Sequence, residues 1–176
     1  MKKNKMGFLN LTMIGVGLFL ILSCEGPPGP PGADGADGVN IVGDVFEIVG
    51  TFNAQGNFGI YDEFGFEVLE SDKVLIYRLD GVDDDLDVWR LLPQIVFHQN
   101  GIFNYSFDFT LVDYTVFIEG NFDLTTLGPE WTEDQVFRVL VVPADFINAR
   151  LDLADHDAMI KLLGVDTKDI PRIMLN

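Results

Sequence analysis

The chain has 176 residues, of which 28 are acidic and 11 are basic, and its formal net charge at pH 7 is −17. This charge argues against binding to nucleic acid or to anionic lipid headgroups, because both attract surfaces rich in lysine and arginine. A single cysteine excludes an intrachain disulfide and any metal site built from several cysteines. The acidity also serves to keep a phenylalanine-rich domain soluble.

The N-terminus has the pattern of a secretory signal. Three lysines lie within the first five residues, an apolar run covers residues 8–22, and Ser23-Cys24 follows. The alternative is an uncleaved transmembrane anchor, which needs about 20 apolar residues, and this run is shorter. Residues 21–24 (ILSC) resemble a lipobox, so we expect residues 1–23 to be a signal peptide and Cys24 to become the lipidated N-terminus. Cleavage would remove three lysines and no acids, which changes the net charge from −17 to −20.

Residues 24–38 form a short collagen-like segment. Glycine recurs at every third position from Gly26 to Gly38, in the sequence GPPGPPGADGADG. Glycine at this period is the collagen repeat, because only glycine fits at the axis of the triple helix. The segment is short, so we interpret it as a semi-rigid spacer of up to about 40 Å, at about 3.1 Å per residue. Whether it joins the chain into a trimer or leaves it a monomer stays open.

Residues 39–176 are predicted to form one all-β domain, an antiparallel β-sandwich of Ig-like or jelly-roll type with a short C-terminal helix. The clearest pattern is at residues 103–109, where four aromatic residues alternate with polar ones. Asn100-Gly101 just before them favours a hairpin. Acidic residues from Asp80-Gly81 onward are expected to end one of the strands in a turn. The expected strands are Asp44–Thr51, Phe64–Leu69, Lys73–Leu79, Trp89–Leu92, Gln94–Gln99, Phe103–Phe109, Tyr114–Glu119 and Val136–Val142.

The C-terminal part changes character. Residues 144–149 are expected to form one or two helical turns. Residues 155–163 carry apolar residues at helical spacing, and Gly164 is the expected helix end. The tail at residues 170–176 is apolar enough to dock on the domain.

An acidic loop at residues 80–87 is a weak candidate for calcium, which takes six to eight oxygen ligands. Its spacing does not fit an EF-hand, because Val88 and Gln94 stand where glycine and glutamate are required. The alternative is a solvated hairpin loop whose charges discourage edge pairing. The four candidate ligands are Asp80, Asp83, Asp85 and Asp87.

No catalytic motif is visible. The two histidines, His98 and His156, lie outside any recognisable motif and are expected to be ordinary surface or partly buried residues. No cofactor and no catalytic residue is therefore predicted, and the chain is not expected to be an enzyme. Trp131, in a loop-like segment, is a weak candidate for ligand binding, since aromatic rings stack on apolar ligand surfaces. The alternative for the aromatic residues is the core.

Three stretches together resemble small collagen-like lipoproteins of the Bacteroidota type: residues 24–38 (CEGPPGPPGADGADG), Trp89–Phe97 (WRLLPQIVF) and Val136–Phe146 (VFRVLVVPADF). The resemblance implies a lipid anchor in the outer membrane, facing the periplasm or the cell surface. It supplies no active-site residues. The expected function is a non-catalytic binding module for an envelope protein or glycan. The alternatives are an extracytoplasmic hydrolase acting on glycans and a structural trimer joined through the collagen-like segment.

Overall fold

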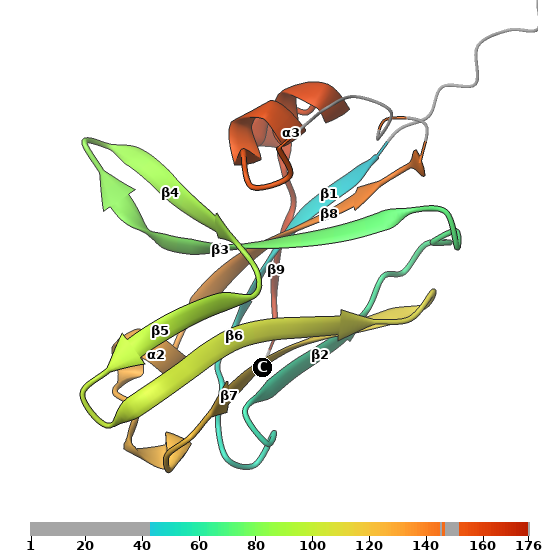
Figure 1. Ribbon diagram of the computed structural model, residues 1–176. Coiled ribbons are helices and arrows are strands. Elements are labelled where there is room, and N and C mark those ends of the chain that lie inside the picture. The colour runs from blue at the N-terminus through green and yellow to red at the C-terminus, as the bar shows by residue number, and fades with distance from the viewer. Residues whose placement is uncertain (1–42, 145, 147–151, 176) are drawn as a thin grey trace, which may run out of the picture. The chain divides into compact units, whose positions relative to one another are not determined.

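The computed structural model describes residues 43–144, 146 and 152–175, and these residues form a β-sandwich with few helices (Figure 1). Cys24 and the collagen-like segment lie outside the described residues. Within the described part of the chain, no helix is both long and apolar enough to cross a membrane.

Sheet A has five strands in the order β4-β3-β8-β1-β9, and sheet B has four in the order β2-β7-β6-β5. All neighbouring strands are antiparallel except β9, which pairs parallel to β1. The strands of sheet A are β1 (Asp44–Gly50), β3 (Lys73–Asp83), β4 (Leu86–Leu91), β8 (Gln135–Val142) and β9 (Arg172–Met174). Those of sheet B are β2 (Gly59–Glu63), β5 (Gln94–His98), β6 (Gly101–Phe109) and β7 (Asp113–Gly120).

The main core lies between the two sheets. Alternate residues of each strand point into it, as the two-residue period of a strand requires. Sheet A contributes residues such as Ile48, Ile76 and Val139, and sheet B contributes Phe103 and Val116, all fully buried. Phe103, Tyr105 and Phe107 of the aromatic alternation in β6 therefore belong to the core between the sheets, whereas Phe109 at the strand end is 44% exposed. The predicted sandwich is confirmed.

Helix α3 (His156–Leu163) covers part of the other face of sheet A (Figure 1). The Asp155 side chain accepts a hydrogen bond from the backbone N–H of Ala158, and Gly164 ends the helix in the left-handed region, with φ 66°. The predicted helix is confirmed. Met159, Ile160 and Leu163 pack on outward-facing residues of β3 and β8, which forms a second, smaller core. Three one-turn helices complete the described elements: η2 (Leu124–Thr126), α2 (Pro129–Thr132) and η4 (Thr167–Asp169).

Seven of the predicted strands are present, and the prediction at residues 64–69 is wrong. Phe64 and Val68 are buried there, but Gly65 has φ 73°, in the left-handed region that an extended strand cannot include. The segment packs as an irregular loop, and the strand at this edge is instead β2. The predicted turn at Asp80-Gly81 is also wrong, because β3 continues to Asp83 and the two-residue turn is Asp84-Asp85, both with positive φ.

The β5–β6 hairpin is confirmed, with its turn one residue earlier than predicted. His98 pairs with Gly101, so the turn residues are Gln99 and Asn100. Gly101 has φ 150°, and a Cβ atom there would come within 3 Å of the side chains of Asn121 and Phe122, so only glycine fits. The predicted docking of the tail is confirmed by β9. The helical turns expected at residues 144–149 lie mostly outside the described residues.

Candidate functional site

Two arginines are buried on opposite faces of sheet A. Arg78 of β3 points between the sheets and is 5% exposed, whereas Arg138 of β8 points to the face that carries α3 and is 4% exposed. A buried charge is costly unless it is paired and hydrogen-bonded, so each arginine marks a place where the fold has assembled polar partners.

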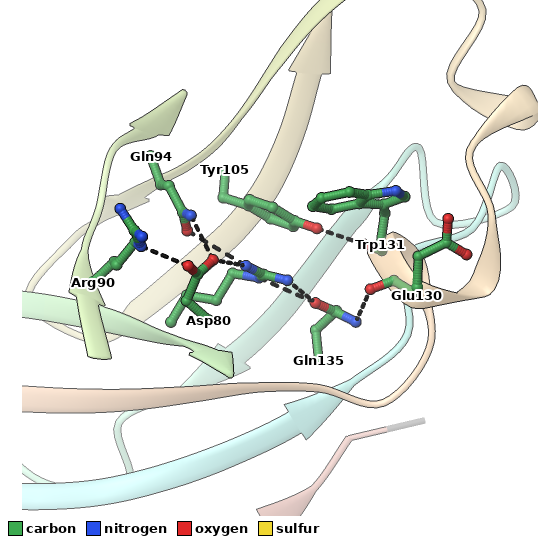
Figure 2. Close-up of polar contacts among 8 residues, drawn as sticks. Asp80, Arg90, Gln94, Tyr105, Glu130, Trp131 and Gln135 are labelled. Atoms are coloured by element: carbon green, nitrogen blue, oxygen red, sulfur yellow. Dashed lines mark hydrogen bonds and ion pairs between the residues drawn. The ribbon is translucent and has the colours of Figure 1, made fainter. Parts of the chain in front are cut away.

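The Arg78 network consists of Arg78, Asp80, Arg90, Gln94, Tyr105 and Gln135 (Figure 2). It joins β3, β4 and β8 of sheet A to β5 and β6 of sheet B. Arg78 Nε and Nη2 donate to Gln135 Oε1 at 3.0 and 2.7 Å, and Nη1 donates to Asp80 Oδ1 at 3.0 Å. The guanidinium carbon lies 4.4 Å from the centre of the Tyr105 ring, which is a cation–π contact.

Asp80 joins this network to the surface. Its carboxylate also accepts from Arg90 Nε at 2.6 Å and from Gln94 Nε2 at 2.8 Å, and the Arg90 side chain is 58% exposed. Partial burial acts to raise the pKa of Asp80. The hydrogen bonds from Gln94 and Arg90, with the charges of Arg90 and Arg78, outweigh it and hold the pKa below its usual value.

On its other side the network holds α2 against the sheets. Gln135 Nε2 donates to the carbonyl oxygen of Glu130, and the Tyr105 hydroxyl donates to that of Trp131 at 2.6 Å (Figure 2). Gln135 Nε2 also donates to the carbonyl oxygen of Glu133. Carbonyl groups at a helix end lack partners within the helix, and these side chains supply them. Burial raises the pKa of Tyr105 to about 12, so its hydroxyl stays a donor at neutral pH.

The Arg138 cluster consists of Glu47, Trp89, Arg138, His156 and Arg172. Arg138 pairs with Glu47 through two nitrogens, and Arg172 Nε donates to the other carboxylate oxygen at 2.7 Å. The Trp89 ring lies under the Arg138 guanidinium at 4.0 Å and stacks on the imidazole of His156, with centroids 5.4 Å apart. Residues from four strands and α3 therefore meet at one carboxylate and one guanidinium.

His156 is held in one protonation state by this cluster. Arg138 Nη1 lies 2.7 Å from Nε2, and because a guanidinium only donates, Nε2 must accept. The proton is then on Nδ1, which donates to Asp157 Oδ1 at 2.9 Å. Burial lowers the pKa of His156, and the positive charge of Arg138 lowers it further. The nearby carboxylates of Asp157 and Asp155 raise the pKa, but the net shift is downward.

The structure gives the residues that were singled out from the sequence different roles. Asp80 belongs to the Arg78 network, while Asp83, Asp85 and Asp87 lie at the end of the β3–β4 hairpin and are exposed. Among the described residues, no group of three or more histidine, cysteine, aspartate or glutamate side chains is placed to hold a metal ion.

Trp131 and the histidines pack against other rings. Trp131 is half-buried, with its ring 5.5 Å from that of Phe103 in an edge-on contact. His98 is half-buried and stacks on Phe122 at 5.5 Å. His156 is buried, at 8% exposed, which corrects the expectation of a surface or partly buried residue.

Glu47, Arg138 and Gln135 were not recognised from the sequence. The signal for the first two is a charge inside an apolar strand, in VFEIV at residues 45–49 and VFRVLVV at residues 136–142. Such a charge requires a partner. The sequence does not say which one, because Glu47 and Arg138 are 91 positions apart.

The outer face of sheet B carries exposed apolar side chains next to the edge of the sheet. Phe97 is 83% exposed, Ile95 is 64% exposed, and Ile102, which pairs directly with Phe97 across β5 and β6, is 44% exposed. We call these three residues the β5 strip. Four surface grooves with volumes of about 200 to 340 Å³ are lined by described residues, and neither histidine nor any arginine lines them.

No family model, no curated protein and no solved structure matches this chain. The function is therefore proposed from the sequence, the fold and the geometry of the described residues.

Proposed function

We propose that the chain is a lipoprotein of the bacterial outer membrane, anchored by acyl chains on Cys24, and that its β-sandwich is a non-catalytic binding module. The basic N-terminus, the apolar run and the ILSC sequence support the anchor. Acyl chains on one cysteine give stable anchoring, because each buried methylene contributes about 0.8 kcal/mol.

The observation that carries the binding function is the β5 strip. Large apolar side chains on a regular strand pair are normally buried, and an exposed group of them marks a surface that another molecule covers. Phe97 has the largest exposed fraction of the exposed large hydrophobic residues in the described part of the chain. The backbone of β5 and β6 is held in a hairpin of known register, so this surface is presented by a rigid element.

The buried histidine and the two buried arginines are fully occupied by structural contacts, which supports a non-catalytic role. Both ring nitrogens of His156 have partners, and Arg78 and Arg138 are saturated by carboxylates, amides and aromatic rings. Every buried side-chain nitrogen or oxygen of the described residues has a hydrogen-bond partner. These groups serve to hold α2, α3 and β9 in place.

The anchor is tested by growing cells that express the full chain with an alkyne analogue of palmitate. We expect the wild-type chain to be labelled and Cys24→Ala to be unlabelled and lost from the membrane fraction. A Cys24→Ala chain that keeps both the label and its place in the membrane would contradict the anchor. Protease treatment of intact cells then separates a surface orientation, in which the domain is digested, from a periplasmic one, in which it is protected.

The binding surface is tested with a photoreactive phenylalanine analogue placed at position 97, or at position 86 as the matched control. Leu86 is 71% exposed at the end of the β3–β4 hairpin and lies outside the β5 strip. We expect adducts after illumination of intact cells only when the analogue is at position 97. Adducts at both positions or at neither would remove the special role of the strip.

A further inference from the structure

The four edge strands of the sandwich differ in how well they are protected from pairing. Charged residues and short length keep an exposed edge from adding another strand. Strand β4 carries Asp87 and Arg90, β2 carries Asp62 and Glu63, and β9 has three residues with Arg172 among them. Strand β5 reads QIVFH and contains no lysine, arginine, aspartate or glutamate. It is therefore the one edge among the described strands that is both uncharged and of ordinary length.

The free side of β5 is available to a partner strand. Its backbone hydrogen bonds, within the described residues, go to β6 alone. The side chains of Ile95 and Phe97 stand on the outer face and are 64% and 83% exposed, and Val96 between them points inward and is half-buried. The edge thus combines unpaired backbone groups with apolar side chains, the two features that strand addition uses.

We propose that this edge binds a second copy of the chain, with β5 antiparallel to β5 of the second copy across a two-fold axis at Val96. The two four-stranded sheets would then form one continuous sheet. In this register Phe97 faces the second copy's Ile95, Ile95 faces its Phe97, and Gln94 faces its His98. Pairs of an aromatic and a β-branched residue are favourable across strands, and the reciprocal contacts are those of a two-fold interface.

The distribution of charge argues for a second copy as the occupant. Two copies of a domain with this net negative charge repel each other across most of their surfaces, so self-association needs a contact free of carboxylates. All five residues of β5 meet that condition, and in the proposed register no acidic residue faces another. A basic partner would gain most from the acidic surfaces and would have no preference for an uncharged edge.

A five-residue strand makes a small interface, so the association is expected to be weak in dilute solution. If the chain is lipid-anchored, as proposed above, confinement to a membrane raises the local concentration of copies and favours the pair. Only this enhancement rests on the proposed anchor. The pairing itself rests on the proposed role of the β5 strip as a binding surface, and it names the occupant of that surface.

The test is disulfide cross-linking of the full chain carrying Val96→Cys, in membranes treated with a mild oxidant. Residues directly opposite in an antiparallel pair have Cβ atoms about 4.5 to 5.5 Å apart, which is close enough for a disulfide to form with small adjustment. We expect a band at twice the mass of the chain on a non-reducing gel. Adding Phe97→Lys should reduce this band at least tenfold, because it places two like charges in the interface.

Two controls make the result specific. Ser71→Cys puts an exposed cysteine outside β5 and should leave the chain at monomer mass. The chain whose one cysteine is Cys24 should do the same, and cross-linking of that chain would instead count against lipidation, so the two proposals fail separately. If Val96→Cys is poorly folded, sedimentation of the purified mature chain over a range of concentrations decides, with Phe97→Lys as the comparison.

Three results would overturn the inference. One is a Val96→Cys chain that stays at monomer mass while the wild-type chain sediments as a monomer at every concentration. The second is a cross-linked band whose mass is that of the chain plus a different protein, which would assign β5 to another partner. The third is a trimeric mass that Phe97→Lys leaves unchanged, which would assign the association to the collagen-like segment.

Discussion

The two buried arginines of sheet A lie on the neighbouring strands β3 and β8, yet they hold different parts of the molecule. Arg78 is bonded to residues of β3, β5 and β8, and its network fixes α2 and the side of the sandwich between β4 and β5. Arg138 is bonded to Glu47, His156 and, through Glu47, to Arg172, so its cluster fixes the C-terminal α3 and β9 to the sheet. One arginine joins the two sheets, and the other attaches the C-terminal elements.

The two sites also differ in how their charges are balanced. Arg78 shares one carboxylate, Asp80, with the exposed Arg90, and neutral amides and a tyrosine complete its surroundings. In the Arg138 cluster one buried carboxylate, Glu47, serves two arginines. Loss of a single side chain should therefore matter most where no second group can compensate.

The largest effect is expected from Glu47→Gln. The change leaves Arg138 buried without its carboxylate, and breaking a buried pair in this way costs about 3 to 5 kcal/mol in the free energy of unfolding. Urea denaturation measures it. Glu63→Gln, an exposed glutamate on β2, is the control and should change the free energy by no more than about 0.5 kcal/mol. Equal effects of the two changes would mean that the Glu47 pair contributes nothing special.

Arg78→Met should have a smaller effect, about 1 to 3 kcal/mol, because it leaves Gln135 Oε1 without its donor while Asp80 keeps Arg90 and Gln94.

Arg90→Met removes an arginine from the same carboxylate at an exposed position and should cost at most about 1 kcal/mol. The ranking Glu47, Arg78, Arg90 follows from what each change leaves unpaired: a buried arginine without its carboxylate, a buried amide oxygen without its donor, and a carboxylate that keeps two other partners. A reversed order in the same denaturation experiment would contradict the comparison.

The two sites should also respond to pH in different ranges. The folded-state pKa of His156 lies below its ordinary value of 6.5, so the unfolded chain binds this proton first as the pH falls. Stability is therefore full above about pH 6.5 and decreases below it until the folded-state pKa is reached, by at most about 1.4 kcal/mol per pH unit for one proton. His156→Gln should remove this decrease below about pH 6.5, and Arg78→Met should retain it. Denaturation curves at several pH values measure both.

The smallest expected effect is the loss of folding stability when Asp80 is protonated in acid. Its folded-state pKa is lowered from the usual 3.8, so its contribution is full above that value and is lost as the pH falls through the folded-state pKa. In Asp80→Asn this part of the acid dependence should be absent, while the decrease due to His156 remains. If acid unfolding below pH 4 follows the same curve in both proteins, Asp80 is not stabilised by its arginines.

The sequence predicted those parts of the fold whose signal is local. The alternation in β6, the apolar run of β8 and the Asp155–Gly164 boundaries of α3 are all written in consecutive residues. Strand β2 was missed because GIYDE has no clear alternation, and β9 because three residues carry no period. Residues 64–69 were predicted to be a strand, and Phe64 and Val68 are buried, but the left-handed backbone of Gly65 makes that segment a loop.

The polar sites were predictable only in part, for a physical reason. Arg138 within an apolar strand indicates a buried charge, but its hydrogen-bond partners Glu47 and His156 come from β1 and α3, and whether these residues meet depends on the strand order. Asp80 was predicted only as a weak candidate ligand for calcium in an acidic loop. Its role in the structure follows from its position two residues after Arg78 in β3, which places both side chains on the same face. The exposure of Phe97 was likewise hidden, because an edge strand and a central strand can have the same sequence pattern.

The parallel pairing of β9 with β1 gives the domain a mechanical property. Asp44 begins β1, and Leu175, which follows β9, donates to the carbonyl of Val49 near the far end of β1. A pull between Asp44 and Leu175 therefore slides the two strands along each other, and their backbone hydrogen bonds and the Glu47–Arg172 ion pair are loaded together rather than one after another. Tension applied between these two ends of the domain therefore meets the C-terminal strand in its most resistant direction.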